Sequence, residues 1–182
     1  FPNGVGEIGN DGCLCHGASN SDTKISISGL PEKFESATNY SLQLTISNEE
    51  IARNNQSAQG GFRIIVNIGV LYFNNSEGII IDDGWTHQES SNQQRIWNFS
   101  WLSPDDNTTM ARLLVYGNAV NGNQQQTGDN WNDLEVYIPG VQNFDPIPTE
   151  TMTEHELETF DRTMLFSGLI VLLYICYRII KD

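Results

Sequence analysis

Apolar and polar side chains alternate over short stretches through most of the chain before residue 141. Residues 40–46 show the pattern most clearly. One face carries the apolar side chains of Tyr40, Leu42, Leu44 and Ile46. The other face carries the polar side chains of Ser41, Gln43 and Thr45. A period of two places alternate side chains on opposite faces of an extended chain. We therefore predict a half-buried strand here.

Further stretches have the composition of short strands. They cover residues 24–30, 62–73, 79–81, 96–101, 110–116 and 133–138. Gly69 interrupts the long run at 62–73, which indicates a bulge or a bend. Because turns rich in Gly, Asn and Pro separate these stretches and no amphipathic helix lies among them, the sequence predicts an all-β fold, an antiparallel β-sandwich.

Three aromatic residues share one face of the stretch at 96–101. They are Trp97, Phe99 and Trp101. Aromatic side chains spaced by two usually pack inward, so we expect them in the core. The alternative is an exposed aromatic strip that binds a ligand.

The end of the chain has a different pattern. Residues 142–152 read as a linker, and Thr153 with Glu156 fits a capping box at the start of a helix. The apolar run at 164–180 is roughly seventeen residues, or about 25 Å of helix, so we predict one C-terminal transmembrane α-helix. The organisation expected is therefore a loop at 1–22, a β-sandwich at 23–141, the linker, and a juxtamembrane and membrane helix at 153–182.

Charge and processing signals favour an exported protein. The chain carries a formal net charge of -14, which repels phosphate backbones and argues against a nucleic-acid partner. Arg178 and Lys181 follow the apolar run, so the positive-inside rule predicts a cytoplasmic C-terminus with the β domain outside the cell, anchored at its surface. The start at Phe1 is interpreted as the result of signal-peptide removal. Sequons for N-glycosylation begin at Asn39, Asn55, Asn74, Asn98 and Asn107.

The strongest chemical signal is the cluster Cys13-Leu14-Cys15-His16, in a chain with only 3 Cys and 3 His. It is close to the C-x-x-C-H motif for covalent haem attachment. A local disulfide beside an exposed histidine, or a metal site, explains the same residues. No hydrolase motif or paired acid and base stands out, so we expect no catalytic activity.

Several strings resemble one known family, the reeler-like domain also called choice-of-anchor V. They are Gly60-Gly61-Phe62, Trp85-Thr86-His87, Trp97 to Trp101 through Pro104, and Tyr116 to Asn123 followed by Thr127-Gly128-Asp129. The resemblance covers residues 1–138. It implies an immunoglobulin-like β-sandwich on exported, C-terminally anchored surface proteins of bacteria and archaea.

Many members of this family carry C-x-x-C-H and a His-Thr pair. The resemblance therefore implies haem c bound through Cys13 and Cys15, with His16 and His87 as axial ligands, and a role in electron transfer beside other redox subunits. The match is incomplete, because only one residue separates the two cysteines and Gln follows His87.

Two alternatives stay open at this point. In the first, Cys13 and Cys15 form a disulfide in a non-catalytic surface adhesion or structural module, or in an accessory subunit of a membrane complex. In the second, copper or zinc binds Cys13, Cys15, His16 and His87, since thiolate and imidazole suit both ions.

Overall fold

A computed structural model describes residues 2–53, 57–148 and 181 of the chain. Two compact units divide the sequence, one spanning Phe1–Ile147 and the other Pro148–Asp182. The first unit contains all the strands reported below. The linker after Pro148, the predicted capping box and the predicted transmembrane helix at 164–180 lie outside the described residues.

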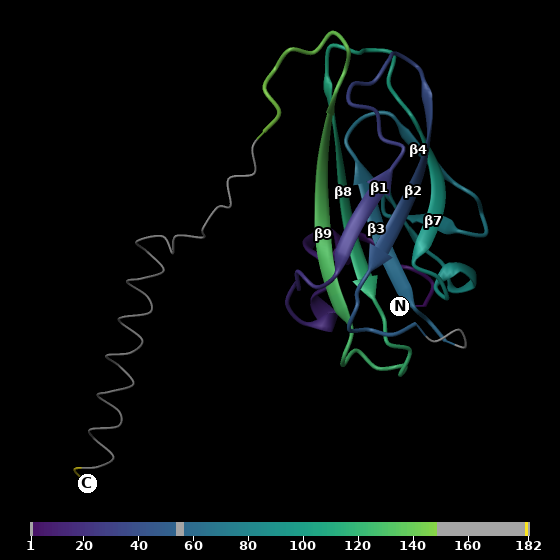
Figure 1. Cartoon of the computed structure of the whole chain (residues 1–182), viewed down its shortest axis with the longest axis vertical. Helices are drawn as coiled ribbons and strands as arrows, with labels where there is room; N and C mark the ends of the chain where they lie inside the picture. Colours follow the sequence, from purple (N-terminus) through teal and green to yellow (C-terminus); the bar gives the residue numbers. More distant parts are fainter. Residues whose placement is uncertain (1, 54–56, 149–180, 182) are drawn as a thin grey trace. The chain divides into compact units, whose positions relative to one another are not determined.

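Nine strands in the described part of the chain form two antiparallel sheets (Figure 1). The orders are β1-β2-β7-β4 in the four-stranded sheet and β5-β6-β3-β8-β9 in the five-stranded sheet. The strands are β1 (Lys24–Ser28), β2 (Asn39–Ser47), β3 (Gly60–Val66), β4 (Val70–Phe73), β5 (Gly78–Ile81), β6 (Gly84–His87), β7 (Ile96–Leu102), β8 (Met110–Ala119) and β9 (Asn130–Pro139). The predicted all-β sandwich is therefore confirmed. Within these residues, no helix is long and apolar enough to cross a membrane.

Alternation decides which face of each strand is buried. In β2, Leu42, Leu44 and Ile46 are buried while Ser41 and Gln43 are exposed. The buried side chains of both sheets form one apolar core between the layers. The predicted half-buried strand at 40–46 is confirmed, and its polar face is the outer surface of the four-stranded sheet.

The run at 62–73 consists of two strands that belong to different sheets. β3 pairs with β6 and β8, whereas β4 pairs only with β7 among the described strands. Gly69 lies in the turn between them with a φ of 76°, a left-handed conformation that favours glycine. A Cβ there would meet the Trp101 ring and the Leu102 carbonyl. The predicted break at Gly69 is thus the point at which the chain changes sheets.

Aromatic side chains fill the centre of the core. Trp97 and Trp101 are 0% exposed, and Phe99 stacks on Phe73 with ring centroids 4.7 Å apart. Phe62 and Trp97 pack edge to face, with ring centroids 5.0 Å apart. Such pairs stabilise a core by about 1 kcal/mol beyond their buried area. The aromatic face of β7 is therefore core, and the alternative of an exposed ligand-binding strip is wrong.

Candidate functional site

A buried arginine fixes the segment that contains the cysteine cluster. Arg63 lies between the core residues Phe62 and Ile64 on β3, so alternation directs it to the outer face of the five-stranded sheet. It is nevertheless 0% exposed, because the N-terminal segment covers it. Its Nε donates to Oδ1 of Asn10 at 2.9 Å, and its Nη1 donates to the carbonyl of Val5 at 3.3 Å.

The same guanidinium also binds the turn between β5 and β6. It donates to the carbonyl oxygens of Ile81 and Asp82, the latter at 2.8 Å. Burial lowers the pKa of Arg63, and the nearby acidic residues Asp82, Asp83 and Glu7 oppose that shift. Arginine keeps its charge even so, and carbonyl groups satisfy its donors. Arg63 therefore ties together the N-terminal segment, β3 and the β5–β6 turn.

Tryptophan on β9 anchors the other end of this segment. The indole nitrogen of Trp131 donates to the carbonyl of Gly17 at 2.8 Å, and its backbone carbonyl accepts from Asn20 at 2.7 Å. A Cβ on Gly12 would overlap the Trp131 ring. The N-terminal segment thus runs across the sheet from β6 to β9, close enough that only glycine fits against the indole.

The cysteine cluster forms a tight turn in this segment. η2 (Leu14–His16) is a short 3-10 helix, and the backbone N–H of His16 donates to the carbonyl of Cys13 at 2.8 Å. Cys13 is half-buried and Cys15 is exposed, and both thiols are free. Burial, together with the neighbouring Cys15, raises the pKa of Cys13 to about 12. The two sulfur atoms consequently sit in different environments, and Cys13 is the more shielded of the two.

His16 meets a buried acid. Its Nδ1 lies 3.0 Å from Oδ2 of Asp129, in a loop that ends at β9, and the two side chains are 22% and 1% exposed. Neither atom forms a hydrogen bond to any described residue, and their contact is an ion pair when the imidazole is protonated. The other oxygen of Asp129 accepts from the backbone N–H of Asn121 at 2.9 Å. His16 therefore joins the N-terminal segment to the loop at 120–129.

His87 makes its contacts on a different strand. Its Nδ1 accepts from the backbone N–H of Phe62 at 3.1 Å, and its ring leaves no room for a Cβ on Gly61. β3 and β8 lie between β6, which carries His87, and β9, beside which His16 is bound. The described contacts of the two histidines thus involve different partners, and no described contact links them.

These positions correct the prediction of an electron-transferring haem protein. Two thioether bonds need both sulfur atoms presented to one macrocycle, whereas here Cys13 is half-buried before the 3-10 turn and Cys15 is exposed within it. His16 and His87 are engaged by Asp129 and Phe62. The haem, cytochrome and electron-transfer interpretation is wrong.

The structure also bears on the other two interpretations of the cluster. Cys13 and Cys15 are both free, so the structure lacks the disulfide that the first alternative expected. For the second, no group of three or more His, Cys, Asp or Glu side chains in the described part of the chain is arranged to hold a metal ion. The predicted copper or zinc site is therefore not assembled from Cys13, Cys15, His16 and His87.

Sequence reasoning missed the residues that organise this region. In the sequence, Asp129 stands out only as part of the string Thr127-Gly128-Asp129, because its contact with His16 depends on the fold. Arg63 could have been identified from the sequence, because it is the single charged residue in an apolar run, between Phe62 and Ile64. A charged side chain within an apolar strand is almost never fully buried unless it is paired, so it predicts hydrogen-bonding partners nearby.

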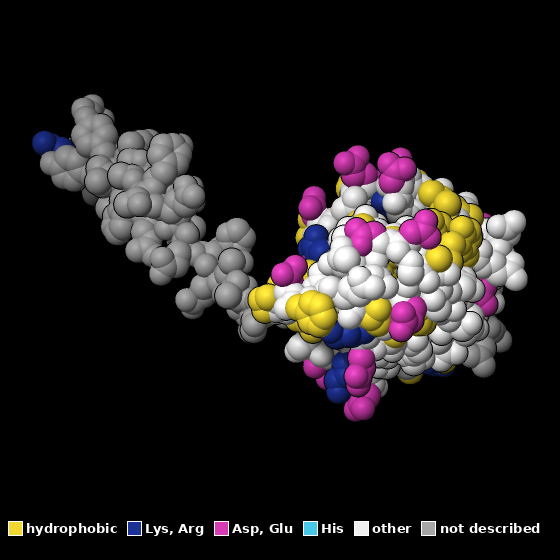
Figure 2. Space-filling view, turned by 90° about the horizontal axis from the view of Figure 1, so that it is seen from above, with side chains coloured by type: hydrophobic (Ala, Val, Ile, Leu, Met, Phe, Trp, Pro, Cys, Tyr) yellow, Lys and Arg dark blue, Asp and Glu magenta, His cyan; other side chains and the backbone are white. Residues whose placement is uncertain are grey.

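Acidic side chains are scattered over the surface, and Lys and Arg are fewer, in the face shown in Figure 2. They do not gather into one strongly charged patch on that face. Fold and surface together define an all-β, two-sheet module whose N-terminal segment packs as a cover on the five-stranded sheet.

Comparison with solved structures places reeler domains among the proteins similar to this chain. The human F-spondin reeler domain shares 13% identity at a TM-score of 0.44, over 69% of this chain and 96% of that one. A conjugative transposon lipoprotein from Bacteroides eggerthii shares 11% at a TM-score of 0.40, over 65% and 98%. A conjugate transposon protein from Bacteroides vulgatus shares 9% at a TM-score of 0.44, over 72% and 95%. No cytochrome is among these, and likenesses at this level do not assign a family.

No protein-family model matches the chain, and no curated protein matches it.

Proposed function

We propose that this chain is a non-catalytic surface module, with an adhesive or structural role outside the cell. The observation that carries the proposal is the packed state of the cysteine–histidine segment. Arg63 and Trp131 hold it on the sheet, and its histidine faces the buried Asp129. The residues that suggested redox chemistry thus serve to cover a sheet face.

The sequence supports an extracytoplasmic location for the module. The reeler-like strings around β7 and β8 are typical of exported, anchored proteins with immunoglobulin-like sandwiches, and we propose the same for this chain. The apolar run at 164–180 would supply the anchor, with the C-terminus in the cytoplasm. Asn39 is exposed at the start of β2, which makes this sequon accessible to glycosylation.

Two measurements on the full chain test the proposal. Biotinylation of intact cells with an impermeant reagent is expected to label the lysines of the β domain, because that domain lies outside the membrane. Beads coated with the purified full chain are expected to adhere to the cell surface or to the matrix around it. The location outside the cell is contradicted if the domain is labelled only after lysis, and the adhesive role is contradicted if coated beads adhere no better than beads coated with albumin.

An absorption spectrum supplies the check on cofactor chemistry. The purified chain, with and without dithionite, is expected to show no Soret band, because Cys13 and Cys15 are not presented together. A haem-stained band at the mass of the chain on a denaturing gel would contradict this expectation.

A further inference from the structure

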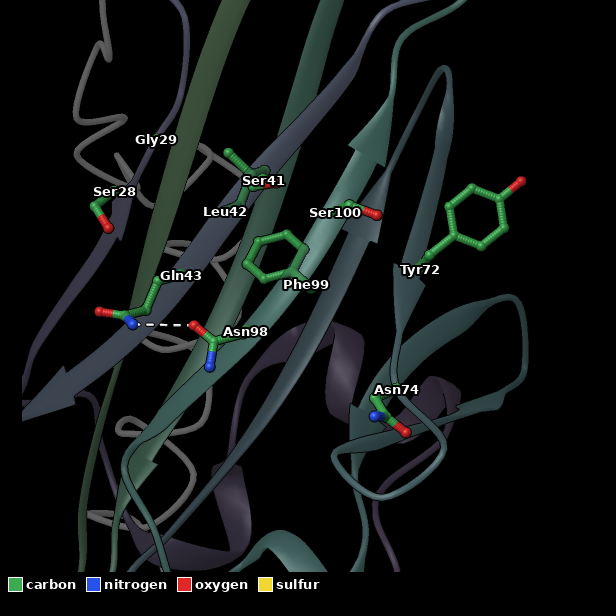
Figure 3. Close-up of a pocket in the computed structure, with 10 residues that line it drawn as sticks. All are labelled: Ser28, Gly29, Ser41, Leu42, Gln43, Tyr72, Asn74, Asn98, Phe99 and Ser100. Atoms are coloured by element: carbon green, nitrogen blue, oxygen red, sulfur yellow. Dashed lines mark hydrogen bonds between the residues drawn. The ribbon is translucent and has the colours of Figure 1, made fainter.

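The outer face of the four-stranded sheet contains a shallow hollow of about 400 Å³ (Figure 3). Its volume lies at the lower end of the range of ligand pockets, roughly 300–1,000 Å³. It is lined by residues from all four strands and the turn after β4: Ser28, Gly29, Ser41, Leu42, Gln43, Tyr72, Asn74, Asn98, Phe99 and Ser100. Leu42 and Phe99 border it although their side chains are buried in the core.

Strand register builds one row of this lining. Ser28 on β1 lies opposite Gln43 on β2, which in turn lies opposite Asn98 on β7. The amide of Gln43 donates from Nε2 to Oδ1 of Asn98 at 3.0 Å, drawn as the dashed line in Figure 3. This bond orients both amides and leaves Oε1 of Gln43 and Nδ2 of Asn98 for a ligand. The backbone N–H of Asn98 also donates to the carboxylate of Glu77 at 2.8 Å, which steadies the strand at this point.

A second row runs parallel to the first, two residues further along the strands. Ser41 on β2 lies opposite Ser100 on β7, and Ser100 lies opposite Tyr72 on β4. The serine side chains are short, so they form a low floor, while the longer Tyr72 stands at the edge of the sheet. Tyr72 is 50% exposed, and its phenol end points away from the strand (Figure 3).

The residues that line the hollow carry no charge, although the chain as a whole is strongly acidic. None of the ten residues is charged, in a sequence with 23 acidic and 9 basic residues. Amides and hydroxyls pair with groups that both donate and accept, and an exposed aromatic ring packs against flat apolar surface. An anion would be repelled by the net charge of -14, and a purely apolar ligand would leave the amides unpaired.

We propose that this hollow binds a neutral saccharide. Hydroxyl groups of the sugar pair with the amides of Gln43 and Asn98 and with the serine hydroxyls, and the C–H face of a pyranose ring packs on Tyr72. The hollow is open to solvent, so a sugar unit within a longer chain can enter it. The proposal deepens the surface-module function and rests on it, since it names the chemical class that the module would hold.

Saccharide binding in the hollow requires that Asn98 carry no glycan. Asn98 begins a sequon, and a glycan on its Nδ2 would occupy the hollow. Mass spectrometry of the native protein is therefore expected to find the peptide that contains Asn98 unmodified. A glycan on most copies of Asn98 overturns the proposal.

Binding is tested with the full chain made without glycosylation. Saturation-transfer NMR and titration calorimetry use maltose, cellobiose, lactose, chitobiose and mannobiose as probes, and a heparin disaccharide as the anionic comparison. At least one neutral disaccharide is expected to bind, and the heparin disaccharide is not. Tyr72→Ala and Gln43→Ala are each expected to raise the dissociation constant about tenfold, because each removes a contact to the sugar, and tenfold corresponds to about 1.4 kcal/mol.

Matched controls lie on the same molecule. Val70 is 46% exposed on β4, outside the hollow, so Val70→Ala is expected to leave the dissociation constant unchanged. Absence of binding by every neutral probe overturns the proposal, as does binding that Tyr72→Ala and Gln43→Ala leave intact. In either case, adhesion of beads coated with the full chain would show that the surface-module function survives without this saccharide site.

Discussion

Arg63 and Asn10 are joined by a hydrogen bond of 2.9 Å between the guanidinium Nε and the side-chain Oδ1. One residue lies on β3 and the other in η1 (Glu7–Asp11), a short 3-10 helix near the start of the chain. Because Arg63 is fully buried, this bond is shielded from water and strengthened accordingly. It makes the N-terminal segment a part of the sandwich rather than a loose extension.

Arg63→Met is expected to reduce the free energy of unfolding by about 3 kcal/mol, because it removes a buried guanidinium that donates to the carbonyls of Val5, Ile81 and Asp82. Urea denaturation of the full chain in mild detergent, followed by tryptophan fluorescence, measures the change. Arg112→Met is the control, since Arg112 is half-exposed in its pair with Glu135 and should cost less than about 1 kcal/mol. Equal losses in the two variants would contradict the role given to Arg63.

Gly69→Ala is expected to destabilise the protein by about 3 kcal/mol. The substitution adds the strain of a positive φ to a collision of Cβ with Trp101 and Leu102. Gly17→Ala provides a matched control, because Gly17 also has a positive φ, of 93°, but nothing lies within 4 Å of its added Cβ. Gly17→Ala should therefore cost only about 1 kcal/mol. The midpoint of urea unfolding is measured for both variants. Similar midpoints would contradict the claim that the added Cβ at position 69 collides with Trp101 and Leu102.

Much of the fold follows from the sequence because its cause is local. Alternation at 40–46 is enough to predict both the strand and its buried face, and Gly69 marks the break in the run at 62–73. The change of sheets at Gly69 could not be predicted, since it depends on which distant strand each half pairs with. β6 (Gly84–His87) was also missed, because its four residues lack the run of isoleucines that marks the equally short β5.

The candidate site was less predictable for the same reason. Cys13, Cys15 and His16 are adjacent in sequence, which makes them look like a ligand set. Their surroundings are supplied by Arg63, Asp129 and Trp131, whose proximity exists only in the folded chain. The hollow is likewise invisible in the sequence, because Gln43, Asn98 and Tyr72 meet only through strand register.

Stability is expected to fall at alkaline pH through Cys13. Its pKa is about 12 in the folded protein against 9.0 for a free thiol, so unfolded chains ionise first as the pH rises. The stabilisation is complete below pH 9 and is lost between pH 9 and 12. From pH 8 to 10 the native protein should lose about 1 kcal/mol more than Cys13→Ala, since one pKa unit equals about 1.4 kcal/mol. Urea titrations of both proteins under reducing conditions measure this difference. An identical pH dependence would contradict it.

The two thiols of the N-terminal turn should react at different rates. Iodoacetamide at pH 8 is expected to alkylate Cys15 readily and Cys13 at least about tenfold more slowly, because the thiolate is the reactive form and burial suppresses it in Cys13. Peptide mass spectrometry reports each cysteine separately.

In Arg63→Met the protection of Cys13 should be lost, since the segment that buries it is released from β3. Arg112→Met should preserve the protection, because Arg112 does not contact that segment in any described hydrogen bond. Equal alkylation of both thiols in the native protein would show that the turn is not packed. Protection that persists in Arg63→Met would show that Trp131 holds the segment without help from the buried arginine.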